Sequence, residues 1–318
     1  MKLISVVSPC YNEEDNIELL TDRVREIFAA MPQYRYEHII IDNHSTDKTV
    51  EKLRVIAARD KNVKVIINAR NFGHIRSPQH AIMQATGDAV IVLLSDLQDP
   101  PELICEMVKE WEAGYPIVVG IKTASEEPKL MYAIRSAYYK LVGRLTDVKV
   151  LQHYTGFGLY DRKVIEILRQ DFRDPYPYFR GMIAEIGLPH KELSYNQKRR
   201  YRGITKNNFY TLYDMAMLGI TNLSKVPLRL VTFGGFVFAF LSLVAGFLYL
   251  LAKLVFWNQF QLGLAPTMIG LFFLGSVQLI GIGIIGEYVG SIHTIVQNRP
   301  LVTEQERVNF IKEIPDRD

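Results

Sequence analysis

The most informative part of the chain reads Leu93-Leu94-Ser95-Asp96-Leu97-Gln98-Asp99-Pro100-Pro101-Glu102. It ends an apolar run from Ala89 that is rich in β-branched residues and predicts a strand buried on both faces. Ligands of open α/β sheets bind beyond the carboxyl ends of the strands, where Asp96 and Gln98 would lie. Both side chains offer the hard oxygen atoms that Mg²⁺ and Mn²⁺ prefer. The alternative is an ordinary turn, in which Asp99 caps a helix that the two prolines begin.

Three earlier segments of the chain repeat this arrangement of strand, polar turn and helix. The strands are expected at Leu3–Ser8, His38–Ile41 and Val63–Ile67. Helices are expected from about Ile17 to Ala30, after Lys48, and from about Ser77 to Ala85. Regular alternation of strands and helices predicts an α/β domain with a parallel sheet. The polar turns that follow the four strands would then line one edge of the sheet and one cleft.

The chemistry of these turns suits a nucleotide. Tyr11 can lie against a base, Glu13 can bind a ribose, and Asp42 can accept from a base N–H or a ribose hydroxyl. Arg70 and Asn71 can donate hydrogen bonds to phosphate. A dinucleotide site and a P-loop are disfavoured, because neither a G-x-G-x-x-G after the first strand nor a Walker A sequence occurs. Taken singly, each Asn or Asp in these turns could also be a turn former or a helix cap.

Composition narrows the class of protein. The net charge of +3 over 318 residues is too small to indicate a nucleic-acid partner. Two cysteines, Cys10 and Cys105, form no disulfide framework and favour a reducing compartment. The residues before Pro9 are too few for a signal peptide and are better explained as the first strand.

The C-terminal third carries two long apolar segments, Leu230–Ala252 and Leu264–Ile285. Each is long enough to cross about 30 Å of hydrocarbon, whereas a buried hairpin inside a soluble domain rarely contains two such runs. An amphipathic segment from Asn208 to Lys225 is expected to lie along the membrane interface. Lysine and arginine flank the pair, and the connection between the two spans has neither, which predicts that both termini are cytoplasmic.

Four motifs occur in a fixed order: Pro9-x-Tyr11-Asn12-Glu13-Glu14, Asp42 with Ser45-x-Asp47-x-Thr49, Arg70-Asn71-Phe72-Gly73-His74, and Ser95-Asp96-Leu97-Gln98-Asp99-Pro100-Pro101-Glu102. Together with the membrane segments, the motifs resemble the family 2 glycosyltransferases. The most similar branch is that of the dolichyl-phosphate mannose synthases and bactoprenol glucosyltransferases. The resemblance covers essentially the whole chain. It implies a GT-A-like, Rossmann-like α/β fold, with a mostly parallel sheet, helices on both faces, interfacial helices and two C-terminal transmembrane helices.

This resemblance also implies an organisation and a site. The expected parts are a cytoplasmic GT-A domain at 1–206, interfacial helices at 207–228, two transmembrane helices at 229–296 and a cytoplasmic tail at 297–318. The donor would be bound by Pro9, Tyr11, Asn12, Glu13, Asp42, Arg70, Asn71, Gly73, Ser95, Asp96 and Gln98. The acceptor phosphate would be aligned by Arg135, Arg200, Arg202 and Lys206. Asp96 and Gln98 would hold Mg²⁺ or Mn²⁺, and Asp96, Arg135 and Arg202 are the expected catalytic residues.

The sequence departs from the family pattern at two positions. The family usually has Asp-x-Asp at the metal strand, and Leu94 stands at the first carboxylate here. The family often reads Asp-Asp-Gly-Ser after the second strand, where this chain has Asp42-Asn43-His44-Ser45. Losing a carboxylate beside the metal predicts weaker metal affinity, with loss of activity as the stronger alternative. The basic loop at 198–206 has an alternative too, as a patch that attracts anionic lipid.

The expected protein is an enzyme of the plasma membrane that spans it more than once and faces the cytoplasm. It would transfer a sugar with inversion from a nucleotide-diphosphate sugar, UDP-glucose as the best guess, to undecaprenyl or another polyprenyl phosphate. The resemblance implies a homo-oligomer, a tetramer. The alternatives are mannosyl or N-acetylhexosaminyl transfer to the same lipid, and a membrane scaffold whose site has decayed. A processive polysaccharide synthase is disfavoured, because more spans and a Gln-x-x-Arg-Trp-like segment would be needed.

Overall fold

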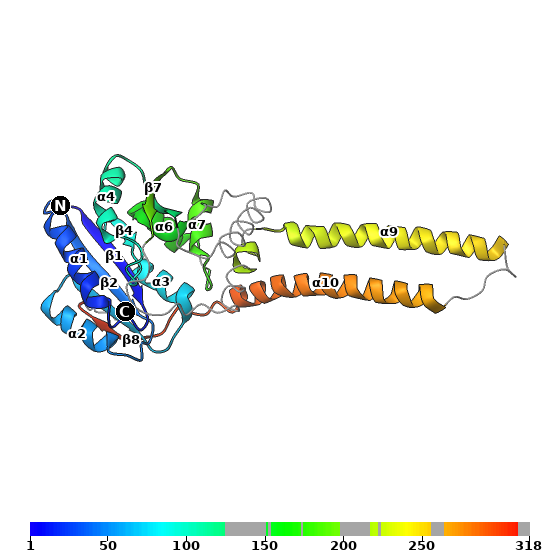
Figure 1. Cartoon of the computed structure of the whole chain (residues 1–318), viewed down its shortest axis with the longest axis horizontal. Helices are drawn as coiled ribbons and strands as arrows, with labels where there is room; N and C mark the ends of the chain where they lie inside the picture. The colour runs from blue at the N-terminus through cyan, green and yellow to red at the C-terminus, as the bar shows by residue number, and fades with distance from the viewer. Residues whose placement is uncertain are drawn as a thin grey trace, which may run out of the picture.

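The computed structural model describes residues 1–124, 151, 154–172, 174–197, 217–221, 224–255 and 264–310. Its strands are β1 (Leu3–Cys10), β2 (Arg35–Asp42), β3 (Val63–Asn68), β4 (Ala89–Val92), β5 (Ile117–Ala124), β6 (Tyr154–Asp161), β7 (His190–Asn196) and β8 (Glu304–Val308). Its helices are α1 (Ile17–Ala29), α2 (Thr49–Arg59), α3 (Gly73–Gln84), η1 (Pro101–Leu103), α4 (Ile104–Glu112), α6 (Arg162–Gln170), α7 (Phe179–Ile186), α9 (Val226–Val255) and α10 (Leu264–Val296). Figure 1 shows a sheet domain from which α9 and α10 extend together.

The strands form one eight-stranded sheet in the order β7-β5-β6-β4-β1-β2-β3-β8. Neighbours β4, β1, β2 and β3 run parallel, as do β5 and β7. Strand β6 is antiparallel to both of its neighbours, and β8 is antiparallel to β3. The prediction of a mostly parallel sheet is confirmed. The four parallel strands of its centre end at one edge, and this edge carries the polar turns.

Helices cover both faces of the sheet, also as predicted. On one face α1, α2 and α4 pack against the strands, and α3, α6 and α7 pack on the other. Helix α1 shows the pattern that causes this arrangement: Ile17, Leu20, Val24 and Phe28 recur at helical spacing and are all buried. Burying each such side chain contributes about 1.5–3 kcal/mol, so the apolar stripe fixes which side of α1 meets the sheet.

Two element boundaries differ from the expected ones, and each has a local cause. Strand β4 ends at Val92 rather than Leu94, although the Leu93 amide still donates to the carbonyl of Val7 at 2.9 Å. Helix α3 begins at Gly73 rather than near Ser77, with Pro78 inside it. A Ser-Pro pair is typical of a helix start, since proline lacks an amide proton. Here the Ser77 hydroxyl instead accepts from the side chain of Asn68 on β3 at 2.9 Å.

Helices α9 and α10 lie side by side and form an antiparallel hairpin (Figure 1). Within them, Val226–Tyr249 and Thr267–Val296 are long and apolar enough to cross a membrane, and neither span is buried inside the chain. Phe238 packs edge-on against Phe273 with ring centroids 6.0 Å apart. The outward apolar side chains therefore need a non-aqueous environment, which fits the predicted membrane spans.

The segment after α10 returns to the sheet. It was expected only as a tail, and β8 instead completes the sheet beside β3, with Val308 opposite Val65. The Thr303 carbonyl accepts from the amide of Ala69 at 2.9 Å. Asn309 donates from its side chain to the carbonyls of Ala57 and Val63 at 2.6 and 2.8 Å. The end of the hairpin is thus fastened to the strand that leads into the Arg70 turn.

Candidate active site

The turn after β4 presents Asp96 and Gln98 on one open face. Leu94, Asp96 and Gln98 are half-buried, whereas the residues between them and Asp99 are buried. Leu97 adopts a positive φ of 57°, which is rare for a branched side chain and is tolerated because that side chain is buried in the core. The Gln98 amide donates to the Asp96 carboxylate at 3.2 Å. The two predicted metal ligands are therefore both partly exposed, and so is Leu94, which offers no ligand.

Asp99 does not cap the helix that follows, so the capping alternative is wrong. The cap position is Pro100, and no side chain caps η1. Asp99 is fully buried and accepts a hydrogen bond from the hydroxyl of Tyr195 on β7. Its second oxygen has no hydrogen-bond partner among the residues that the structure describes. Burial raises the pKa of Asp99 to about 6. Asp99 thus holds the turn after β4, which contains Asp96 and Gln98, against β7 rather than starting a helix.

The turns after β1 and β2 are bonded to each other. The Asn12 amide donates to the Ser45 hydroxyl at 2.8 Å, and the Asn12 side chain accepts from the Thr46 amide at 2.7 Å. Asn12 has a positive φ of 54°, a conformation that asparagine adopts more readily than most residues. Asp42 is fully buried and accepts from both the amide and the hydroxyl of Ser45. Burial raises the pKa of Asp42, while the bonds from Ser45 oppose that shift.

Glu13 lies deeper than its expected role would suggest. Its side chain is 7% exposed and accepts from the Asn16 side chain at 2.6 Å. Its backbone amide donates to the hydroxyl of Thr49 at 2.9 Å. These contacts lock the start of α1 to the start of α2. Tyr11 is half-buried in the same turn.

An asparagine cluster joins the turns after β2 and β3. The Asn43 side-chain NH₂ donates to the Asn71 side-chain oxygen at 2.9 Å and to the Gly73 carbonyl at 3.1 Å. The Asn43 oxygen accepts from Asn68 at 3.1 Å and from the Phe72 amide at 2.9 Å. Gly73 has a φ of +85°, which glycine adopts without strain. Arg70 lies over the Phe72 ring at 4.0 Å from the centroid and is exposed.

A further contact joins the turn after β4 to the end of β1: the Ser95 hydroxyl donates to the Pro9 carbonyl at 2.9 Å. All predicted donor-site residues therefore lie at the ends of the four parallel strands or in the turns that follow them, at one edge of the sheet. The predicted acceptor residues Arg135, Arg200, Arg202 and Lys206 lie outside the described residues.

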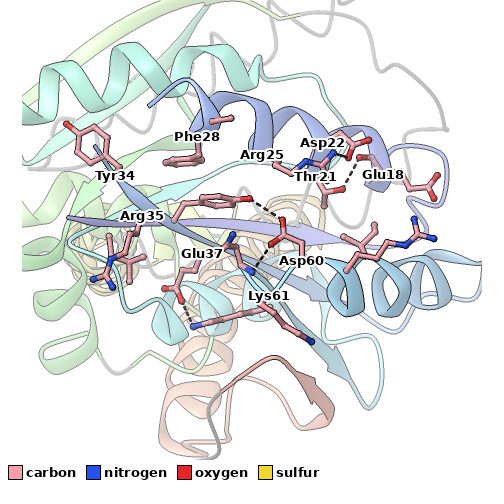
Figure 2. A pocket seen from close by; sticks show the side chains of 17 residues that line it. Glu18, Thr21, Asp22, Arg25, Phe28, Tyr34, Arg35, Glu37, Asp60 and Lys61 are labelled. Atoms are coloured by element: carbon pink, nitrogen blue, oxygen red, sulfur yellow. Dashed lines mark hydrogen bonds and ion pairs between the residues drawn. The ribbon is translucent and has the colours of Figure 1, made fainter. Parts of the chain in front are cut away.

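A large groove lies at the opposite edge of the sheet, and none of the predicted site residues lines it. It has a volume of about 920 Å³ and runs between α1, the amino ends of the strands and the α2–β3 turn. Figure 2 shows the side chains that line this groove, among them Asp22 next to Arg25. Glu37 pairs with Lys64 at 2.5 Å, and Asp22 pairs with Arg25 at 2.7 Å. Two cationic side chains of the groove, Lys64 and Arg25, are therefore already paired with carboxylates.

Comparison with known proteins decides the family. Residues 5–168 match the model of the glycosyl transferase family 2. This chain belongs to that family. The sequence resemblance and the fold prediction are therefore confirmed.

The glycosyltransferase has relatives that match nearly its whole length. It is 36% identical over 300 residues to an uncharacterised glycosyltransferase of Synechocystis, covering 94% of this chain and 93% of the relative. It is 33% identical over 298 residues to the SfII prophage-derived bactoprenol glucosyl transferase of Shigella flexneri, covering 93% and 96%. In fold it is similar to the glucosyl-3-phosphoglycerate synthase of Mycobacterium tuberculosis, with a TM-score of 0.50 and 20% identity over 69% of this chain and 78% of that one.

The site of this glycosyltransferase fits a divalent ion that is shared with a substrate. Asp96 and Gln98 supply two oxygen ligands on an open face, and Mg²⁺ is commonly held by one or two side chains together with substrate phosphates. Within the described ranges, no group of three His, Cys, Asp or Glu could hold a metal alone. A phosphate-bearing donor would therefore have to complete the coordination.

Sequence reasoning missed three structural partners of the glycosyltransferase site. Tyr195 holds Asp99, Asn68 holds Asn43, and Asn43 arranges the Arg70 turn. The Asn43 position also explains one departure from the family pattern. A carboxylate there has no proton to donate to Asn71 and Gly73, whereas an amide donates to both. The sequence does show that Asn43 is a polar residue just after a strand. Whether its side chain must donate or accept hydrogen bonds becomes clear only when the neighbouring turns are packed against it.

Proposed function

We propose that this glycosyltransferase moves a sugar from a nucleotide-diphosphate sugar, UDP-glucose as the best candidate, to a polyprenyl phosphate. The reaction takes place at the cytoplasmic face of the plasma membrane and inverts the anomeric carbon. The observation that carries the proposal is the hydrogen bond from Ala69 to Thr303, because it joins the donor edge of the sheet to the end of the membrane hairpin. The same chain therefore holds the proposed nucleotide-sugar site close to the membrane.

The donor is bound at the carboxyl edge of the sheet. Arg70 and Asn71 face solvent in the turn after β3 and donate hydrogen bonds to the diphosphate. Asp96 and Gln98 hold Mg²⁺ or Mn²⁺ on the open face of the neighbouring turn. When bound there, the ion neutralises charge that develops on the leaving diphosphate.

The acceptor is assigned from the membrane part and from the relatives. The Shigella relative is named a bactoprenol glucosyl transferase, and this chain matches 96% of it, membrane segments included. The long apolar helices α9 and α10 anchor the enzyme where a polyprenyl phosphate resides. Lys225 and Arg229 precede the first span, and Arg299 and Arg307 follow the second. This distribution supports a cytoplasmic sheet domain, beside the nucleotide sugars.

The chemistry needs little from the protein beyond position and charge. An oxygen of the lipid phosphate attacks the anomeric carbon, and the bond from that carbon to the diphosphate breaks, its electron pair leaving with UDP. A single displacement of this kind inverts the anomeric centre. The phosphate is already ionised at neutral pH, so no strong general base is needed. Arg135, Arg200, Arg202 and Lys206 are assigned to align the acceptor phosphate and to screen its repulsion from the donor.

The test is a donor screen with the full chain purified in detergent. Undecaprenyl phosphate is mixed with radiolabelled UDP-glucose, UDP-N-acetylglucosamine or GDP-mannose, and label is counted after extraction into organic solvent. We expect extraction of label from UDP-glucose with Mg²⁺ or Mn²⁺ and none after chelation. Asp96→Asn should lower kcat by about 10²–10³, the range for removing one group that stabilises developing charge.

The matched control is Asp22→Asn, which removes a carboxylate from the opposite edge of the sheet and should retain full activity. Full transfer by Asp96→Ala would show that the ion is not held there. Absence of lipid-extractable label from every donor, with UDP still bound, would contradict the proposed acceptor. Label from GDP-mannose or UDP-N-acetylglucosamine alone would move the assignment of the sugar without changing that of the lipid.

A further inference from the structure

Three arginines come together where the hairpin rejoins the sheet domain. Arg70 belongs to the turn after β3, Arg76 to the first turns of α3, and Arg299 to the segment that follows α10. The guanidinium groups of Arg70 and Arg76 lie 4.0 and 5.8 Å from the centroid of the Phe72 ring. Arg76 also donates to the carbonyl of Pro300, next to Arg299. The donor loop, α3 and the membrane hairpin each contribute one positive charge.

Nothing in the described ranges neutralises this cluster. None of Arg70, Arg76 and Arg299 forms an ion pair with a described carboxylate. The Arg76 Nε–H is buried and has no hydrogen-bond partner among the described residues. Burial lowers the pKa of Arg76, and the charges of Arg70 and Arg299 lower it further. Three like charges and an unused buried donor are costly unless an anion joins them.

The position of two of these charges adds to the argument. Arg70 precedes α3 and Arg76 lies in its first turn and a half, at the end where the helix dipole is positive. Cations are disfavoured at that end and anions are favoured. An oxyanion between the arginines would satisfy both the helix and the side chains.

A groove lies against α10 near this cluster, although none of the three arginines lines it. Tyr176, which interacts electrostatically with Arg76, is one of its lining residues. The groove has a volume of about 550 Å³, and its other walls include Leu218, Gly286, Gly290 and Ile295. Its α10 side also carries Ser291, Thr294 and the carboxylate of Glu287, and Asp174 is a further lining residue, so the groove is mixed in character rather than apolar.

We propose that Arg70, Arg76 and Arg299 form a binding site for a phosphate group at the junction of the sheet domain and α10. This inference rests on the proposed function and adds a subsite to it. The position of Arg299, just after the second candidate span, favours a phosphate that carries a lipid chain, which is the acceptor. The diphosphate of the donor has the same chemistry and is the other source. Arg76 and Arg299 would then contact substrate in addition to the residues that the sequence indicates.

The test measures binding rather than transfer, with the full chain in lipid nanodiscs. Dissociation constants are measured for undecaprenyl phosphate, for undecaprenol as the uncharged probe, and for UDP with Mn²⁺. The variants are Arg76→Gln and Arg299→Gln, with Arg59→Gln as the control because Arg59 is exposed at the opposite edge. Arg299→Gln leaves the donor of the Arg76–Pro300 bond in place, so it reports charge rather than docking of the tail.

We expect both variants to weaken undecaprenyl phosphate binding at least ten-fold, to leave undecaprenol unaffected, and to change UDP binding less than two-fold. Loss on the UDP arm instead would also support the anion site and would identify its ligand as the donor diphosphate. Unchanged binding of both phosphates in both variants would overturn the site. Failure of the proposed function would differ from this result, because the wild-type chain would then bind the probes and transfer no sugar to the lipid.

Discussion

We expect a single side chain, Leu94, to set how strongly the turn after β4 can hold a divalent ion. Leu94, Asp96 and Gln98 are all half-buried in this turn, whereas Ser95, Leu97 and Asp99 are buried. An ion held by Asp96 and Gln98 would have one carboxylate and one neutral amide from the protein, because Leu94 stands where the family usually has a carboxylate. The Coulomb attraction between these side chains and a divalent ion would be correspondingly weaker. The donor diphosphate would then supply more of the negative charge that retains the ion.

The corresponding prediction is that Leu94→Asp tightens metal binding. A second carboxylate on the open face should lower the Mn²⁺ concentration for half-maximal UDP binding by about ten-fold, equivalent to about 1.4 kcal/mol. Calorimetric titration of UDP at several Mn²⁺ concentrations measures this change. Leu94→Asn is the matched control, because it has the same size without the charge. Equal metal requirements for the two variants would show that position 94 does not face the ion.

His38 gives the sheet domain a dependence on pH. It is fully buried on β2, its Nε2 lies 2.9 Å from the Ser8 hydroxyl, and its Nδ1 has no partner among the described residues. Burial lowers its pKa to about 3. Because an unfolded histidine has a pKa near 6.5, the unfolded chain binds more protons between these values. The contribution to stability is therefore complete above pH 6.5 and is lost as the pH falls toward 3.

We expect the free energy of unfolding of the full chain in detergent to fall by about 1.4 kcal/mol for each pH unit below pH 6.5, because the unfolded chain takes up a proton at His38. Asp99 acts with the opposite sign, since its pKa is raised to about 6 and its stabilising neutral form is lost as the pH rises. Comparing the wild type with His38→Gln between pH 7.5 and 4.5 isolates the histidine, because Asp99 is common to both. Exposed His190→Gln should leave the slope unchanged. Parallel profiles for wild type and His38→Gln would contradict this account.

At the scale of elements, the sequence predicts strands and helices that have a local apolar pattern. It does not predict elements that depend on pairing with distant segments of the chain. The apolar runs of β1 to β4 and their polar ends could be predicted, because periodicity and composition are local properties. The start of α3 was misplaced because Ser77-Pro78 has the local signature of a helix start, whereas the Asn43–Asn71–Gly73 contacts extend the helix backward. Strand β8 was missed because Glu304-Gln305-Glu306-Arg307-Val308 has one apolar residue, and its partner β3 lies far upstream.

Strand β8 is held by an ion cluster, and its removal should loosen the donor turn. Glu304 pairs with His80 at 2.5 Å and accepts from Arg307, which also donates to Gln84 at 2.8 Å. Half-buried pairs of this kind contribute about 1 kcal/mol. Glu304→Gln should therefore raise hydrogen exchange about five-fold at 300–308 and at the Ala69 amide, measured by mass spectrometry.

The control for β8 lies on the same strand. Glu306 pairs with Arg54 at 2.6 Å, but both side chains are exposed, so Glu306→Gln should change exchange much less. Equal effects of the two substitutions would mean that the Glu304 cluster does not fasten the strand. If hydrogen exchange at the Ala69 amide were unchanged in Glu304→Gln, the stability of β8 would have no influence on the turn that carries Arg70.

At the scale of the molecule, the sheet domain lies at one end of the helical hairpin, so the whole domain is expected on one side of the membrane. The sheet domain holds the donor turns, and α9 and α10 extend from it as the two candidate spans (Figure 1). We expect the sheet domain to lie in the cytoplasm, because positive residues precede the first candidate span and follow the second. Cys105 is exposed on α4 and Cys10 is buried, so the chain carries one accessible thiol as a natural reporter.

The topology predicts that a membrane-impermeant maleimide labels Cys105 in inside-out vesicles and not in intact cells. Cys105→Ser should abolish the label, because Cys10 is 5% exposed and shielded by the core. Labelling of intact cells would place the sheet domain on the outer side, away from nucleotide sugars, and would contradict the proposed reaction.

The most direct measurement is a crystal structure of the full chain with UDP and Mn²⁺, in which anomalous scattering locates the ion. The account predicts one manganese bonded to the Asp96 carboxylate and the Gln98 amide oxygen and to both phosphates of UDP, with Leu94 beside it and contributing no ligand. A nucleotide bound without manganese, or a manganese held by other side chains, would contradict it.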